Sequence, residues 1–151
     1  MDRVAVDDPR VQEIAAEELR ARLSGVPAVV ADTLVAAQLT AKFGAFDVQH
    51  PDAVADLIPD RGYRVVSRAE GAIRLCDIGV ARAARSSGCG TVLLQGLLEE
   101  ADAAGAALEL SVWHDAPARA WYERHGFVAV GGDPQGHLEM RREYRSIHSV
   151  A

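Results

Sequence analysis

The chain has 151 residues, of which 49% are hydrophobic and 25% are charged, and its formal net charge is −6. This length and composition are typical of one soluble globular domain whose core needs no metal or disulfide for stability. The negative charge argues against nucleic acid as a partner, because nucleic-acid phosphates bind basic surfaces.

The two cysteines, Cys76 and Cys89, lack the spacing of a zinc site or a disulfide framework, so we expect no metal. We expect no membrane partner and no targeting leader, because no apolar stretch approaches the length of a bilayer crossing and no basic-then-apolar segment opens the chain. These observations predict a cytoplasmic protein.

The first third of the sequence predicts two helices. Asp8 is the expected N-cap of the first helix, and Pro9 then occupies its first position. Apolar residues recur after them at helical spacing. These apolar residues are Val11, Ile14, Ala15, Leu19 and Leu23. The Ser-Gly-Val-Pro run at 24–27 ends this helix, and a second one is expected over residues 32–46. Its apolar side consists of Leu34, Val35, Leu39 and Phe43.

The middle of the sequence predicts strands. Residues 54–58 and 63–67 flank a turn and predict a hairpin, and a strand over 73–80 completes an antiparallel meander. After a glycine-rich loop, a helix is expected over 91–104, with Gly105 as its left-handed cap. The side chains expected to point inward from this helix are Val92, Leu93, Leu97 and Leu98.

The remainder of the chain predicts one more strand-helix-strand unit and a final strand. The expected ranges are a strand at 107–113, a helix at 116–125, and strands at 127–130 and 137–141. The whole order predicts an α+β fold in a single domain over 1–142, followed by a polar, loosely ordered tail over 143–151.

The glycine-rich loop reads Arg85-Ser-Ser-Gly-Cys-Gly90 and lies between a predicted strand and a predicted helix. A dinucleotide fingerprint would need glycine where Leu93 stands, and a Walker loop would need a lysine that the loop lacks. Glycines let successive N–H groups approach a ligand, and a helix N-terminus favours an anion. The loop taken alone fits a turn without a ligand equally well.

A second segment, Asp115-Ala-Pro-Ala-Arg-Ala-Trp-Tyr-Glu-Arg-His-Gly-Phe127, resembles the closing motif of the GNAT superfamily of N-acetyltransferases, roughly Asn-x-x-Ala-x-x-x-Tyr-x-x-x-Gly-Phe. In the same way, Arg85-x-x-Gly-x-Gly90 resembles the acyl-CoA pyrophosphate loop of that family. The resemblance covers Ile73 to Arg142 well and is weaker for the segments before them.

The resemblance implies a mixed, mainly antiparallel central sheet of six to seven strands flanked by about four helices. It also implies acetyl-CoA as a cosubstrate and transfer of its acetyl group, by direct attack, to a primary amine of a small molecule or peptide. A homodimer is left open. The residues that the resemblance assigns to acyl-CoA binding are Ile78, Gly79, Val80, Arg85, Ser86, Ser87, Gly88, Cys89, Gly90, Thr91, Asp115, Ala118 and Tyr122.

Two residues are candidates for catalysis. Tyr122 matches the tyrosine that commonly protonates the leaving thiolate in this family, and the alternative is that it packs in the core with Trp121. A phenol and a free thiol have ordinary pKa values of about 10 and about 8.5, so this proton transfer is nearly matched.

Asp77 is the candidate base because it is the only carboxylate inside the central strand. Its ordinary pKa lies about six units below that of an ammonium group, so a water relay or a substrate-orienting role is more credible than direct proton removal. A carboxylate in an apolar strand needs a partner or water. The structural alternative is a salt bridge to an arginine such as Arg74 or Arg64.

The sequence departs from the family pattern at three positions. Arg82 stands where a proline is usual, Ser87 where a second basic residue is common, and Asp115 where asparagine opens the closing motif. Losing one or two such contacts should weaken CoA binding about tenfold. A covalent role for Cys89 is not favoured, since transfer in this family is usually direct, and His114 and His125 have no spaced metal partner.

Two other functions stay open at this point. The altered loop and Asp115 would also suit a catalytically silent GNAT-like module that binds CoA or a protein partner. The third alternative is a soluble α+β binding domain without a CoA site.

Overall fold

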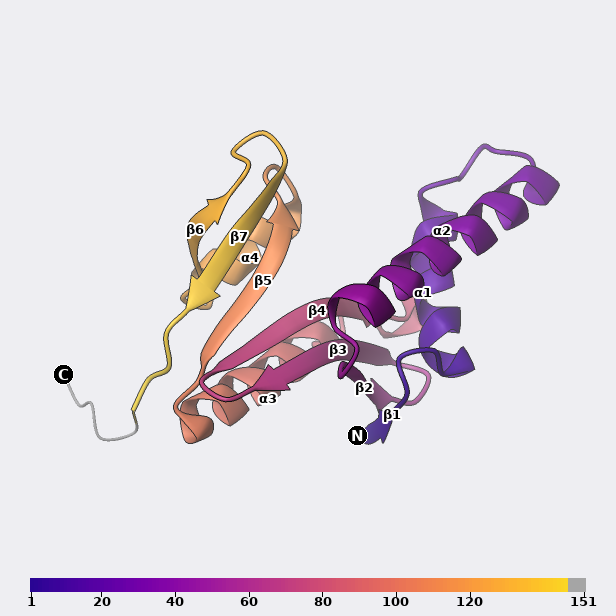
Figure 1. Ribbon diagram of the computed structural model, residues 1–151. Helices are drawn as coiled ribbons and strands as arrows, with labels where there is room; N and C mark the ends of the chain where they lie inside the picture. The colour runs from indigo at the N-terminus through magenta and orange to yellow at the C-terminus, as the bar shows by residue number, and fades with distance from the viewer. Residues whose placement is uncertain (147–151) are drawn as a thin grey trace. The chain divides into compact units, whose positions relative to one another are not determined.

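The structure is a computed structural model and describes residues 1–146 (Figure 1). This part of the chain forms, in order, β1 (Asp2–Val4), α1 (Pro9–Ala21), α2 (Ala28–Gln49), β2 (Val54–Ile58), β3 (Gly62–Ala69), β4 (Ala72–Val80), the 3₁₀ turn η1 (Arg82–Ala84), α3 (Cys89–Ala104), β5 (Ala107–Trp113), α4 (Pro117–Arg124), β6 (Val128–Gly132) and β7 (His137–Arg142). The strands form one seven-stranded sheet in the order β1-β2-β3-β4-β5-β7-β6.

The predicted fold class is confirmed. Strands β4 and β5 run parallel, whereas β1 with β2, β2 with β3, and β7 with both β5 and β6 run antiparallel. The seven strands and four α-helices of the described residues agree with the six to seven strands and about four helices that the resemblance implies. Strand β1 was not predicted, because a three-residue segment with two charged side chains carries no alternating apolar pattern.

The contacts within the chain divide it into two compact units. Unit 1 consists of Met1–Ser67 and Asp77–Leu94, and unit 2 consists of Arg68–Cys76 and the chain from Gln95 onward. Both β4 and α3 pass from one unit to the other. Each unit is described by itself below.

In unit 1, α1 forms as its local sequence predicts. The Asp8 side chain accepts a hydrogen bond from the Arg10 backbone amide at 2.9 Å, and Pro9 occupies the first turn. Four of the five predicted apolar residues are buried on one face: Val11, Ile14, Ala15 and Leu19. The fifth, Leu23, lies beyond the end of the helix and is partly exposed.

The neighbouring helix α2, which contacts α1 (Figure 1), is longer than predicted. It begins directly after Pro27, and it buries Val35 and Phe43 but leaves Leu34 exposed. With 22 residues and a mean hydropathy of 1.2, α2 is long and apolar enough to cross a membrane by length and composition, which corrects the expectation that no apolar stretch approaches this length. The finding is weak evidence for a membrane location, because core helices of soluble proteins meet the same criterion.

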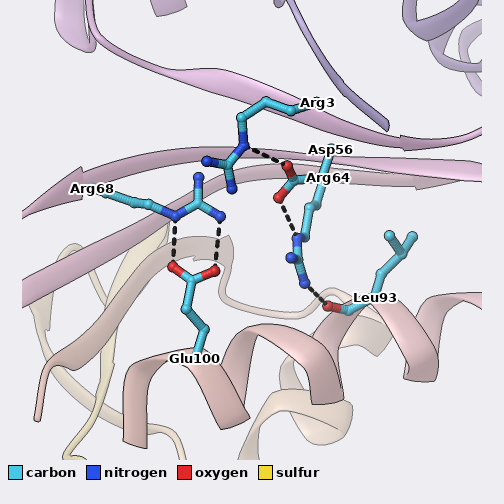
Figure 2. Close-up of polar contacts among 6 residues, drawn as sticks. All are labelled: Arg3, Asp56, Arg64, Arg68, Leu93 and Glu100. Carbon is cyan, nitrogen blue, oxygen red and sulfur yellow. Dashed lines mark hydrogen bonds and ion pairs between the residues drawn. The ribbon is translucent and has the colours of Figure 1, made fainter. Parts of the chain in front are cut away.

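A buried ion pair fastens the first turns of α3 to the strands of unit 1 (Figure 2). The Arg64 guanidinium on β3 donates to the Asp56 carboxylate on β2 at 2.9 Å and to the Leu93 carbonyl on α3 at 2.6 Å. The second Asp56 oxygen accepts a hydrogen bond from Arg3 on β1 at 3.1 Å. Buried charges need such partners, and this cluster links the first turns of α3 to β2 and β3.

Helix α3 starts two residues earlier than predicted, and one of its predicted inward residues is wrong. Leu93 is fully buried, whereas the side chain of Val92 is exposed to 58%. The buried side of this helix is centred on Leu93, Leu94, Leu97 and Leu98, and Val92 lies outside that stripe because successive residues are rotated by about 100° around the helix axis. The left-handed cap at Gly105 is confirmed by its φ of +63°.

Unit 2 is built on β5, which lies between β4 and β7 in the strand order. The predicted range of β5 is confirmed residue for residue, and its side chains Leu108 and Leu110 are buried. Arginine–carboxylate pairs surround this sheet, including Arg68 with Glu100, which Figure 2 also shows. Strand β6 forms one end of the sheet and is exposed along its whole length.

Arg142, at the end of β7, is buried and pairs with Asp102 on α3 at 2.9 Å. Of the predicted loose tail, residues 143–146 include Arg145, whose backbone amide donates to Asp102 at 2.8 Å. Residues 147–151 of that predicted tail lie outside the described part of the chain.

Candidate active site

The loop between η1 and α3 carries most of the predicted CoA-binding residues and turns sharply. Ser86 and Gly88 have φ values of +67° and +81°, a conformation that costs glycine little and serine more. The Val92 amide donates to the Gly88 carbonyl at 3.0 Å, so α3 begins at once after Gly88. Because the first amides of a helix lack partners within it, this end of α3 favours an anion.

A hollow of about 460 Å³ within unit 1 lies beside this loop. It is lined by Ile78, Gly79 and Val80 at the end of β4, by Arg85 of the loop, by Glu18 and Ala21 of α1, and by Arg22 directly after α1. Four residues that the sequence assigns to CoA therefore share one space. The Arg85 guanidinium is exposed and makes no hydrogen bond or ion pair with residues 1–146, so it is available for an anion.

Glu18 and Arg22 were not predicted as site residues. They form an ion pair across one turn of α1, with 3.0 Å between Arg22 Nη2 and Glu18 Oε1. They place one negative and one positive group at the wall of the hollow. The helical spacing predicted that α1 exists, but it could not show which strand end this face of α1 borders.

Asp77, the candidate base, has two partners on the same carboxylate oxygen. The Tyr63 hydroxyl donates to Oδ2 at 2.6 Å, and Lys42 Nζ lies 3.0 Å from Oδ2. The other oxygen, Oδ1, has no hydrogen-bond partner among residues 1–146. The Asp77 side chain is 14% exposed and that of Lys42 is 31% exposed.

The expected arginine partners of Asp77 are therefore wrong. Arg64 pairs with Asp56, and Arg74 pairs with Glu139 through two bonds of 2.9 Å within unit 2. Alternation along β4 predicted the face on which Asp77 lies, and Ile73, Leu75 and Gly79 on that face are buried as expected. The lysine comes from α2, which no local pattern could place against β4.

Tyr63 also explains why residue 79 is a glycine. A Cβ atom at Gly79 would come within 2.5 Å of Tyr63 Cε1, so the ring needs the bare backbone of β4. Burial, followed by the charge of Asp77, raises the pKa of Tyr63 well above its usual range. The phenol therefore stays protonated and serves as a hydrogen-bond donor to Asp77.

Two further residues near the loop have structural roles. The Cys89 thiol is buried and packs against Gly62, where a Cβ atom would come within 2.9 Å of Cys89 Sγ. This position argues against a nucleophilic role. The backbone amide of Arg82 donates to Glu17 Oε2 on α1 at 2.8 Å, a bond that the proline usual at this position could not make.

The remaining predicted site residues belong to unit 2. Tyr122 is buried on α4, and its ring centroid lies 5.1 Å from that of Trp121 and 5.6 Å from that of Phe127. Asp115 is exposed, and Ala118 is partly exposed in the first turn of α4. Within residues 1–146, no cluster of His, Cys, Asp or Glu side chains could hold a metal ion.

A family model described as an acetyltransferase (GNAT) domain matches residues 55–139. Among solved structures, the PaiA N-acetyltransferase from Thermoplasma acidophilum in complex with coenzyme A has a TM-score of 0.65 and 13% identity, covering 95% of this chain and 100% of that one. The ribosomal-protein-S18-alanine N-acetyltransferase from Escherichia coli has a TM-score of 0.54 and 19% identity, covering 72% and 81%.

An aminoglycoside 6′-acetyltransferase type Ii has a TM-score of 0.55 and 18% identity, covering 95% of this chain and 97% of that one. At these identities, the likeness to the three structures shows the fold. No curated protein matches the sequence significantly.

Proposed function

The chain belongs to the GNAT acetyltransferases, and from this we propose that it transfers the acetyl group of acetyl-CoA to a primary amine of a small molecule or peptide by direct attack. The observation that carries the proposal is the hollow of unit 1, where the strand end Ile78–Val80 and the loop residue Arg85 line one space. The PaiA structure, which holds coenzyme A, supports CoA as the carrier.

The loop and the start of α3 would hold the pyrophosphate. Their backbone amides, together with the positive end of α3, favour an anion by about 0.3–1 kcal/mol per contact at an exposed position. Arg85 adds a guanidinium that has no competing carboxylate in the described chain. The pairing of Arg64 with Leu93 helps this geometry, because it holds the first turns of α3 in place.

The end of β4 would hold the reacting thioester. Ile78 and Val80 are partly exposed and line the hollow, so we place the thioester beside their backbone. A backbone N–H aimed at the thioester oxygen would stabilise the oxyanion that forms when the amine attacks.

Asp77 would orient the acceptor amine. Its Oδ2 is occupied by Tyr63 and Lys42, which leaves Oδ1 as the oxygen that can accept an N–H of the acceptor. Because two donors already occupy this carboxylate, we assign it an orienting role and not that of the direct base. The proton of the attacking amine would therefore leave through water, and the family pattern assigns protonation of the leaving thiolate to Tyr122.

Two observations support an amine as the acceptor. Glu18 places a carboxylate at the hollow, and Asp77 on β4 has a carboxylate oxygen, Oδ1, without a partner among residues 1–146, so an amine would be complementary to both. The structures named above include one enzyme named for a ribosomal protein and one named for aminoglycosides. The test must therefore include peptide N-termini as well as aminoglycosides and other small primary amines.

The test measures CoA thiol release with a thiol reagent across these acceptors. We expect release above background for at least one amine, and a loss in kcat of about a hundredfold or more for Tyr122→Phe, the range expected for a missing general acid. Tyr144→Phe, an exposed tyrosine in the same unit, is the matched control and should keep wild-type activity.

For Asp77→Asn we expect a higher KM for the amine, because the acceptor loses a charged hydrogen-bond partner. Binding of CoA without thiol release, together with no effect of Tyr122→Phe, would contradict the proposal. That outcome would favour the non-catalytic CoA-binding alternative.

A further inference from the structure

The turn between β2 and β3 lies directly against the anion-binding loop within unit 1. The Arg61 carbonyl accepts a hydrogen bond from the Ala81 amide, one residue after β4, at 2.7 Å. The next residue, Gly62, is so close to the end of β4 and the start of α3 that a Cβ atom would come within 2.9 Å of both Gly79 O and Cys89 Sγ. The backbone of Arg61 is therefore held beside the loop by this hydrogen bond and by the close packing of Gly62 that follows it.

The Arg61 side chain points onto the loop itself. Its Nη2 donates to Ser87 Oγ at 3.1 Å, and the Ser87 hydroxyl in turn donates to the Ala84 carbonyl. The single proton of this hydroxyl is engaged in the hydrogen bond to Ala84, so Ser87 cannot donate it to a phosphate. A guanidinium has five N–H donors, and only one of those of Arg61 is engaged within residues 1–146.

The charge around the loop is also unbalanced. Arg61 is exposed and pairs with no carboxylate in the described chain, and the same holds for Arg85. The protein as a whole carries a net charge of −6. Two guanidinium groups without a carboxylate partner therefore give this loop a local positive charge that the protein as a whole lacks. Arginine is suited to such a position because its fork of donors matches phosphate oxygens.

We propose that Arg61 is a phosphate-binding residue for acyl-CoA, and that it supplies from the β2–β3 turn the positive charge that Ser87 does not supply from the loop. This inference rests on the proposed function. The Ser87 hydroxyl positions the guanidinium, and the remaining Arg61 donors face the pyrophosphate held by the amides of the loop. The sequence showed a loop short of one basic residue, and the fold brings that charge from 26 residues away.

The test is a titration of CoA by calorimetry with wild type, Arg61→Ala and the double variant Arg61→Ala/Ser87→Lys. We expect Arg61→Ala to weaken binding about two- to fivefold at low ionic strength, as for an exposed ion contact, and the difference to shrink at high ionic strength. The lysine in the double variant returns a charge to the loop and should restore most of the affinity. Arg124→Ala, which removes an exposed arginine from unit 2, is the control and should bind like wild type.

Two shorter ligands identify the phosphate. Dephospho-CoA, which lacks the 3′-phosphate, should show the same loss on Arg61→Ala, whereas S-acetylpantetheine, which lacks every phosphate, should show no difference in kcat/KM. Equal CoA affinity for wild type and Arg61→Ala, a loss that vanishes with dephospho-CoA, or a failed rescue by Ser87→Lys would each overturn the inference. No CoA binding by the wild-type protein would instead contradict the proposed function.

Discussion

Replacing Lys42 with methionine removes the ammonium group that pairs with Asp77 and keeps an unbranched side chain on α2. Asp77 then retains only the Tyr63 hydroxyl, although its side chain is just 14% exposed. Removing one partner of a fully buried ion pair costs about 3–5 kcal/mol, and removing one from an exposed pair costs about 0–1 kcal/mol. Because Lys42 is 31% exposed, the expected loss in the free energy of unfolding lies between, at about 1–3 kcal/mol.

The assay is a double-mutant cycle in urea with Lys42→Met, Asp77→Asn and the double variant. We expect a coupling energy of about 1–2 kcal/mol between the two residues. In the Asp77→Asn background the carboxylate charge is absent, so removing the Lys42 ammonium group should cost less than it does in the wild type. For urea slopes typical of small domains, the loss for Lys42→Met corresponds to a midpoint shift of about 1 M.

The matched control is the exposed pair of Arg20 and Asp32, which are 2.9 Å apart with side chains 56% and 66% exposed. Arg20→Met should cost less than about 1 kcal/mol, and high salt should reduce that cost further. A coupling energy near zero for Lys42 and Asp77, or equal losses for Lys42→Met and Arg20→Met, would refute the reasoning that burial strengthens this pair.

Three further predictions concern the surroundings of the site and unit 2. Gly79→Ala should lower both the melting temperature and CoA affinity, since its methyl group would overlap the buried ring of Tyr63, and unchanged values by thermal shift and calorimetry would contradict this account. Asp102→Asn should destabilise the fold at pH 7 but not in acid: pairing with Arg142 lowers the pKa of Asp102, so its stabilisation is present above the ordinary carboxyl value of about 3.9 and is lost as the pH falls through the lower folded value. A melting-temperature difference between wild type and Asp102→Asn that persists at low pH would argue against that pair as the cause. Arg82→Pro should change stability by less than about 1 kcal/mol in urea, because the lost hydrogen bond to α1 is offset by a less flexible unfolded chain, whereas a larger loss would show that this bond dominates.

Much of the fold could be predicted because its signals are local. The cap at Asp8, the left-handed residue Gly105 and the apolar alternation of β5 each depend on neighbours within a few positions, and all three are confirmed. The errors lie where local signals are weak. Helix α2 has apolar residues around much of its circumference, so its ends and its buried face were poorly specified by spacing.

The sequence by itself determined the identity of the family, because the loop Arg85–Gly90 and the segment Asp115–Phe127 are contiguous motifs. Only the tertiary structure decided which side chains from other elements contact the residues of the predicted site. Lys42 pairs with Asp77 and Arg61 reaches Ser87 through the packing of α2 and the β2–β3 turn against the end of β4. Such pairings depend on how separate elements pack, and no periodicity within one element carries that information.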